Sequence, residues 1–83
     1  MNYLEIVTMD RDYEVRLGHY IRRLRKMRRL TQDDLAAQLQ LRGCDITRSA
    51  LAKIEVGQRH FYPDEIRLLH DILEFEYDDF FAN

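Results

Sequence analysis

The residues best equipped for recognition chemistry lie in a short stretch that begins at Thr47. Arg48, Ser49 and Lys53 carry hydrogen-bond donors, and no carboxylate occurs in this stretch before Glu55. At helical spacing these side chains share one face with a small residue, whereas the opposite face is apolar and consists of Ala50, Leu51 and Ile54. A short helix with an apolar back and a basic, polar front suits the major groove of duplex DNA.

A second short helix must position this donor face, and the sequence predicts it over residues 31–41. Thr31 can cap its free backbone N–H groups, and Asp33 and Asp34 in the first turn complement the helix dipole. Its apolar positions fall on one side and are Leu35, Ala36 and Leu39. The later helix is expected to end at Gly57, which can adopt the left-handed backbone conformation.

Both helices carry sequence motifs that occur together in a known protein family. The blocks L-R-K-M-R-R-L-T-Q-D-D-L-A at 24–36 and S-A-L-A-K-I-E-V-G-Q-R at 49–59 resemble the phage-repressor/Cro-like helix-turn-helix family, also called the xenobiotic-response-element family. The resemblance covers roughly residues 16–81 and rests on L-T-Q-x-x-L-A paired with I-E-x-G. It implies an all-α, compact five-helix repressor-like DNA-binding domain, with helices two and three forming the helix-turn-helix and a lengthened turn between them.

The resemblance also implies a role for individual residues. The third helix, about 47–56, would read base edges, and the matching positions are Arg48, Ser49 and Lys53. Arginine can contact guanine O6 and N7 together, serine can donate or accept, and lysine is a long donor. Phosphate contacts are implied at the start of the second helix and beside the third, at Gln32, Thr47, Gln58 and Arg59. Arg25 matches an arginine that pairs with the glutamate of I-E-x-G, here Glu55, so we assign this ion pair to structure.

The sequence departs from the family pattern at two places. The segment between Leu39 and Ile46 is about five residues longer than the common turn. We expect the second helix to continue to Leu41 and to be broken by Gly43. Arg29 stands where the family usually has a glycine that closes the first helix.

The formal charge of −2 is unevenly distributed along the chain. Residues 16–59 hold eleven lysines and arginines against four carboxylates, whereas residues 60–83 hold one arginine against seven. Part of the basic run at 22–29 complements the dipole at a helix C-terminus, but six cations exceed that need, so we expect some to face phosphate. The alternative is that most of these charges are solvated helix faces.

The remaining segments complete a single domain over 10–83, preceded by an N-terminal arm over 1–9. The arm is expected to be a strand, an extended segment, the start of a helix or a loosely ordered terminus. The first helix is predicted to begin near Asp10 or Asp12 and to end at Arg28. Gly18 lies inside it, where a missing side chain allows close packing.

The C-terminal region is predicted to contain a helix that opens at Pro63 and a short one over 77–81. Phe80 is expected to point inward, and Phe61 or Tyr62 to fold back into the core. The last helix, with part of the helix before it, is predicted to form a dimer face.

Several function classes find no support in the residues. No glycine-rich phosphate loop or nucleophile motif is present, so we expect no enzyme and no cofactor. The three histidines are scattered and Cys44 is the lone cysteine, so we expect no metal site. The absence of a signal peptide, an apolar span and paired cysteines favours a cytoplasmic protein without membrane contact.

Two functions compete at this stage. The first is a sequence-specific, double-stranded DNA-binding transcriptional regulator, with repression as the expected mode, acting as a homodimer on an inverted repeat. The second is a protein-interaction module, such as an antitoxin or an adaptor, that uses the same fold and binds a partner at the acidic, aromatic C-terminus.

Overall fold

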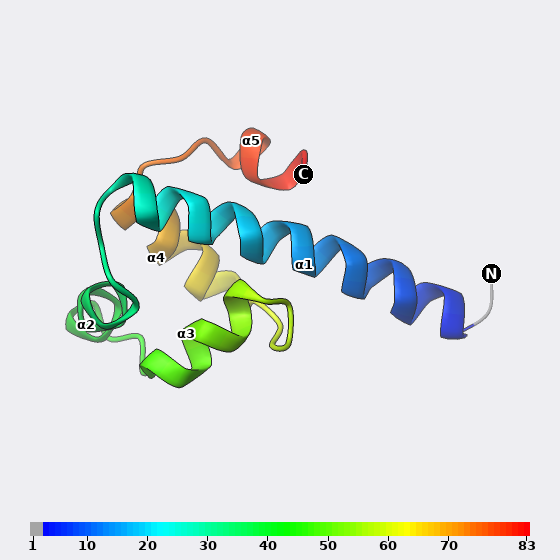
Figure 1. Ribbon diagram of the computed structural model, residues 1–83, viewed down its shortest axis with the longest axis horizontal. Helices are drawn as coiled ribbons and strands as arrows, with labels where there is room; N and C mark the ends of the chain where they lie inside the picture. Colours follow the sequence, from blue (N-terminus) through cyan, green and yellow to red (C-terminus); the bar gives the residue numbers. More distant parts are fainter. Residues whose placement is uncertain (1–2) are drawn as a thin grey trace.

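The protein is built from helices, as a computed structural model of the chain shows for the backbone of residues 3–83 and the side chains of residues 11–83. The elements are α1 (Tyr3–Met27), α2 (Gln32–Leu41), α3 (Arg48–Glu55), α4 (Pro63–Leu73) and α5 (Tyr77–Phe81) (Figure 1). The predicted all-α fold with five helices is confirmed. Within the described residues, no helix combines the length and apolar character that crossing a membrane requires.

The first helix is longer than the sequence analysis predicted. It begins at Tyr3 rather than near Asp10 or Asp12, so residues 3–9 are helical, and its first turns extend beyond the other helices (Figure 1). Residues 1–2 of the expected arm lie outside the described part of the chain. A helix satisfies its own backbone hydrogen bonds, whereas a strand here would need a partner that an all-helical fold does not offer.

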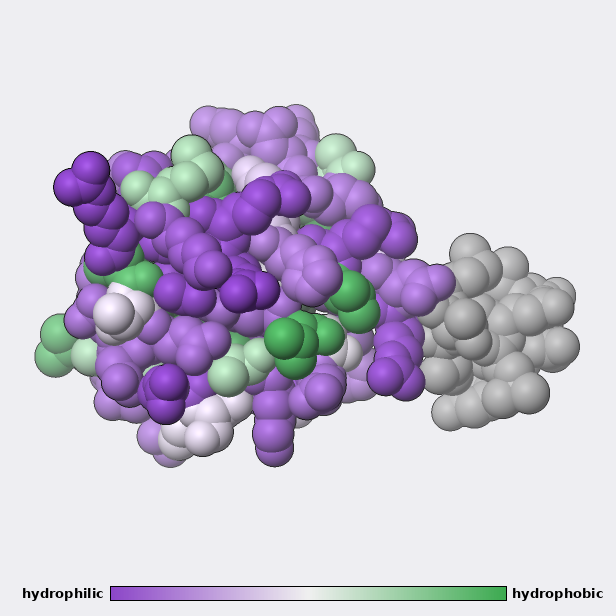
Figure 2. All heavy atoms as spheres, in the orientation of Figure 1, coloured by the Kyte–Doolittle hydropathy of each residue, from purple (hydrophilic) through white to green (hydrophobic). Residues whose placement is uncertain are grey.

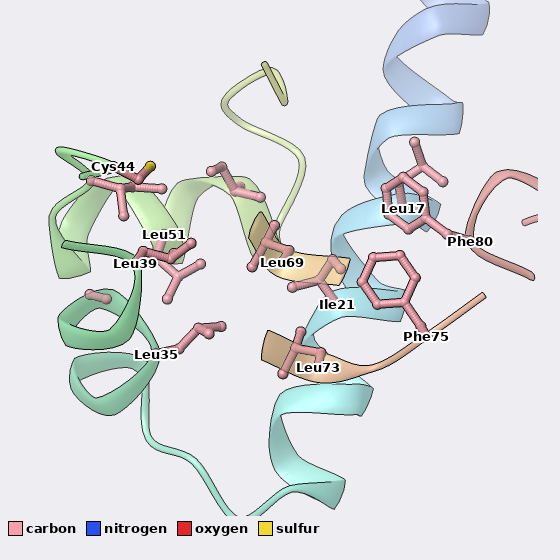
Figure 3. Close-up of a cluster of buried hydrophobic side chains, with 13 residues drawn as sticks. Leu17, Ile21, Leu35, Leu39, Cys44, Leu51, Leu69, Leu73, Phe75 and Phe80 are labelled. Carbon is pink, nitrogen blue, oxygen red and sulfur yellow. The ribbon is translucent and has the colours of Figure 1, made fainter. Parts of the chain in front are cut away.

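The core lies where α1 to α4 converge, and the C-terminal aromatic residues close it on one side (Figure 3). Ile21, Leu35, Leu51 and Leu69 come from four different helices and are completely buried. Burial of apolar surface from four elements supplies most of the stability of such a small domain. This core fixes how α3 lies against α1 and α2.

Two glycines let α3 and its following loop approach α1 closely. A Cβ atom added at Gly18 would collide with the carbonyl oxygen of Ile54 and lie 3.2 Å from the carbonyl carbon of Glu55. A Cβ atom added at Gly57 would collide with the Val15 side chain and lie 2.9 Å from the Val15 Cα. The close packing predicted at Gly18 therefore occurs, and the partner is the C-terminal end of α3.

The boundaries of the helix-turn-helix agree with the prediction. Thr31 accepts a hydrogen bond from the backbone N–H of Asp34 (3.0 Å), while the Asp34 carboxylate accepts one from the Thr31 N–H (2.9 Å). These bonds, the backbone one first, hold the pKa of Asp34 below its usual value. The helix that they open runs to Leu41, and Gly43 follows with a φ of 86°.

The lengthened turn is anchored to the body of the domain. Cys44 and Ile46 are buried, and the Gln40 side chain donates to the Ile46 carbonyl at 2.7 Å. Burial, with smaller contributions from Glu65 and Asp64, raises the pKa of the Cys44 thiol. Cys44 is therefore a core residue of the turn rather than an exposed reactive thiol.

The C-terminal helix is held by aromatic packing. Phe80 is completely buried, as predicted, and its ring lies 6.0 Å from that of Tyr20 and 5.6 Å from that of Phe61. The Tyr13 hydroxyl donates to the Phe81 carbonyl at 2.6 Å. Phe61 is thus the aromatic residue that folds back into the core, whereas Tyr62 is 57% exposed.

Arg29 closes α1 in a conformation that suits glycine better. Its φ is 58°, in the left-handed region where a Cβ atom costs about 1 kcal/mol. Replacement of the exposed Arg29 by glycine should therefore raise the free energy of unfolding by about 1 kcal/mol, measured by urea denaturation. Lys26→Gly, inside α1, is the control and should lower it by a similar amount. An unchanged or lower stability of the Arg29→Gly variant would contradict this reading.

Candidate nucleic-acid interface

The three residues predicted to read base edges lie together on α3. Thr47 caps this helix by accepting a hydrogen bond from the Ala50 N–H at 3.1 Å, and Leu51, Ile54 and Glu55 face the interior. Arg48, Ser49 and Lys53 are all exposed on the outer side. The helix therefore presents a row of donors on a rigid element whose back is fully packed.

Arg48 has a neighbour that the sequence analysis did not pair with it. Its Nε lies 3.8 Å from the Asp33 carboxylate of α2, and both side chains are well exposed, at 65% and 77%. From the sequence, Asp33 is expected only to complement the helix dipole. The distance between Asp33 and Arg48 depends on how α2 and α3 cross, which no local pattern specifies.

A buried polar network joins α3 to the two preceding helices. Nε of Arg25 lies 2.7 Å from Oε2 of Glu55, and Nη2 lies 3.0 Å from Oε1. The hydrogen bonds that Arg25 donates to Glu55 raise the pKa of Arg25, and Arg25 also donates to the Leu30 carbonyl at 2.8 Å. The ion pair predicted between these two residues is present, and the paired geometry satisfies charges that would be costly to bury alone.

Gln32 belongs to the same network. Its side-chain amide donates to Oε1 of Glu55 at 3.1 Å, so one of its two N–H donors is used inside the protein. The phosphate contact predicted for Gln32 therefore depends on the second N–H. Because Arg25, Gln32 and Glu55 come from α1, α2 and α3, their bonds set the mutual position of the three helices.

Thr47 and Gln58 lie at the two ends of α3. The Thr47 oxygen accepts the capping bond, which leaves its hydroxyl hydrogen able to donate. Gln58 is exposed, and its backbone N–H donates to the Lys53 carbonyl at 2.8 Å. Both residues therefore flank the exposed side of α3, and the phosphate contacts at Thr47 and Gln58 stay predictions.

Arg59 has more internal partners than the sequence analysis expected. Nη1 and Nη2 donate to the two oxygens of the buried Glu65 carboxylate at 2.8 and 2.9 Å, and the guanidinium lies 5.1 Å from the centre of the Tyr62 ring. The hydrogen bonds that Arg59 donates to Glu65 raise the pKa of Arg59. Arg59 thus fixes the loop between α3 and α4, and its predicted phosphate contact would be made from a side chain that is already held in place.

The same loop also contacts α1. Nδ1 of His60 lies 2.6 Å from the carboxylate oxygens of Glu14. Neither Glu65 nor Glu14 is expected from the sequence as a partner of this loop. Figure 2 shows that the face on which α3 lies is mostly hydrophilic, with apolar side chains in small, separate groups. Such a surface suits a charged partner better than an apolar one.

Comparison with protein families gave one match that covers most of the chain. Residues 16–79 match the model of the helix-turn-helix domain. Comparison with curated proteins and comparison with solved structures gave no match. The matched range contains α2, α3 and the buried Arg25–Glu55 pair, so the chain belongs to the helix-turn-helix domain family.

Proposed function

We propose that this protein is a sequence-specific, double-stranded DNA-binding transcriptional regulator that acts as a repressor. One observation carries the proposal: Arg48, Ser49 and Lys53 share the exposed side of α3, and the buried Arg25–Glu55–Gln32 network fixes that helix from behind. Donors on a preorganised helix can enter the major groove without an ordering cost at the moment of binding.

The parts of the interface divide into base-reading and positioning groups. α3 would read base edges, while Gln32, Thr47, Gln58 and Arg59 would contact phosphates and set the register of the helix on the duplex. One copy offers only a modest surface to DNA, so we propose that two copies bind an inverted repeat with half-sites about 34 Å apart. Repression would then follow from occupancy of the site.

A salt titration tests the general proposal. Fluorescence anisotropy of a labelled genomic-fragment pool should show binding that weakens steeply as the salt concentration rises, because each phosphate contact releases counterions. Affinity that is absent at low salt, or independent of salt, would contradict DNA binding as the function.

Removal of the Arg48 side chain should relax base preference. An arginine with two hydrogen bonds to guanine contributes about 1–3 kcal/mol of discrimination against other bases. Arg48→Ala should therefore lower the affinity for the preferred site by about tenfold or more while non-specific affinity changes little. Arg42→Ala, at the end of α2, removes the same charge and side chain and serves as the control. Equal losses for both variants on preferred and random duplexes would contradict base reading by Arg48.

The Asp33 carboxylate should restrain the Arg48 side chain and repel the phosphates of the DNA backbone. Its carboxylate lies 3.8 Å from Arg48 on an exposed surface, where it can hold the guanidinium in one orientation and repel the DNA backbone. Asp33→Asn should thus raise affinity for random duplexes and reduce the ratio of specific to random binding, both measured at fixed salt. Asp71→Asn, on the exposed side of α4, is the charge-matched control. An unchanged ratio in the Asp33→Asn variant would show that Asp33 does not restrain Arg48.

The alternative function, protein recognition by the same fold, is supported by the C-terminal surface. Phe81 and Tyr77 are 49% and 38% exposed, next to the carboxylates of Asp78 and Asp79 in α5. Phe81→Ser should disrupt a protein complex at this surface and leave DNA affinity unchanged. A complex lost through Phe81→Ser, in a protein that binds no duplex, would favour the interaction module.

A further inference from the structure

The outer face of α1 carries a row of basic side chains that the helix-turn-helix does not include. His19, Arg22, Arg23 and Lys26 line an open hollow of about 360 Å³. Arg22 and Arg23 lie three and four residues after His19, and Lys26 lies four and three residues after them, which places all four on one side of the helix, away from the buried Leu17 and Ile21. We refer to these four residues as the α1 cationic face.

This face has no acidic neighbour on its own helix and takes part in no ion pair within the described side chains. No carboxylate occurs in the sequence between Val15 and Gln32. The ion pairs in the described part of the chain engage Arg25, Arg28, Arg48, Arg59 and His60, but no member of the α1 cationic face. The helix dipole accounts for cations in the last turn, where Arg25 and Lys26 lie, but not for Arg22 and Arg23.

The α1 cationic face begins where the recognition helix ends. Gly18 abuts the carbonyl of Ile54 and the backbone of Glu55 at the end of α3, and Val15 touches Gly57 in the following loop. Arg22 lies one helical turn after Gly18 on the same side of α1, and Lys26 lies one turn further. The α1 cationic face therefore starts beside the C-terminal end of α3 and runs along α1 away from Gly57, which lies at Val15.

We infer that the α1 cationic face binds phosphates of the duplex that flank the bases read by α3. This inference rests on the proposed DNA-binding function and deepens it, because it extends the footprint beyond the helix-turn-helix. Guanidinium and ammonium groups without internal partners are the usual donors to phosphate oxygens. Arg23 is held 5.5 Å above the Tyr20 ring, so part of the face is ordered before binding.

Neutral substitutions and a salt titration test this inference. The log of the observed binding constant falls with the log of the salt concentration, with a slope of about 0.9 for each phosphate neutralised. Arg22→Gln and Lys26→Gln should each reduce this slope by about one, and the double variant by about two, on a duplex that extends well beyond the selected site. Base preference should stay unchanged. Arg67→Gln, which removes one exposed charge on α4, should leave the slope as in the unmodified protein.

A shorter duplex identifies which phosphates are bound. On a duplex trimmed to the bases that α3 reads, the difference between the Arg22→Gln/Lys26→Gln variant and the unmodified protein should vanish. A slope equal to that of the unmodified protein on the long duplex, or the same reduction with Arg67→Gln, would overturn the inference. If the unmodified protein shows no salt-dependent binding on either duplex, it is the proposed DNA-binding function that fails.

Discussion

Alanine at Gly18 is expected to destabilise the protein by about 3 kcal/mol, in the range of cores forced to accept extra atoms. The added Cβ would collide with the backbone carbonyl of Ile54 and crowd Glu55, and a backbone atom cannot move aside as a flexible side chain can. Helix propensity alone predicts that the substitution stabilises the protein, since alanine is favoured over glycine in a helix by about 1 kcal/mol. Urea denaturation followed by circular dichroism measures the difference.

Gly43→Ala is the matched control for that substitution. Gly43 has a φ of 86°, but a Cβ atom there would meet no atom within 4 Å. This variant should therefore lose only about 1–2 kcal/mol of stability, through the backbone strain that a side chain introduces there. If Gly18→Ala were as stable as the unmodified protein, the close contact between α1 and α3 would not exist as described.

Removal of Glu55 should be the most damaging change to the polar interior. Glu55→Ala would leave the Arg25 guanidinium buried without its carboxylate and would remove the bond to Gln32. Loss of one partner from a buried ion pair costs about 3–5 kcal/mol. Because the same bonds hold α3 against α1 and α2, the variant should also lose DNA affinity, even though Glu55 is only 1% exposed.

Two comparisons separate this effect from a general loss of charge. Arg28→Ala breaks an exposed ion pair with Glu74, 3.3 Å long, and should change stability by no more than about 1 kcal/mol. The double variant Arg25→Met/Glu55→Leu should be more stable than Glu55→Ala, since an apolar pair leaves no buried charge. A double variant that is less stable than Glu55→Ala would mean that the desolvated charge is not the cause.

The helix boundaries that depend on local chemistry could be predicted from the sequence. Thr31 and Thr47 as caps, Gly43 and Gly57 as breaks, and Pro63 at a first turn act within a few residues of their own position. Such signals need no knowledge of the tertiary structure. The start of α1 carries no such signal, because residues 3–17 contain neither proline nor glycine. The predicted start of this helix was therefore too late.

The contacts that were missed all depend on how separate elements meet. Asp33 reaches Arg48 only because α2 and α3 cross at that place, and Glu14 reaches His60 only because the loop after α3 folds onto α1. Glu65 lies six residues after Arg59, but the two meet only because the loop after α3 folds back onto the start of α4. Arg25 and Glu55 were paired in advance through the family pattern, not through their spacing of thirty residues.

Sequence reading by α3 is tested by a binding selection from a random duplex library with the purified protein and with its Arg48→Ala variant. We expect the unmodified protein to enrich one motif, arranged as an inverted repeat with half-sites about 34 Å apart. We expect the variant to lose preference for a guanine within each half-site. Enrichment of no motif by the unmodified protein, or of the same motif with the same guanine by the variant, would contradict sequence reading by α3.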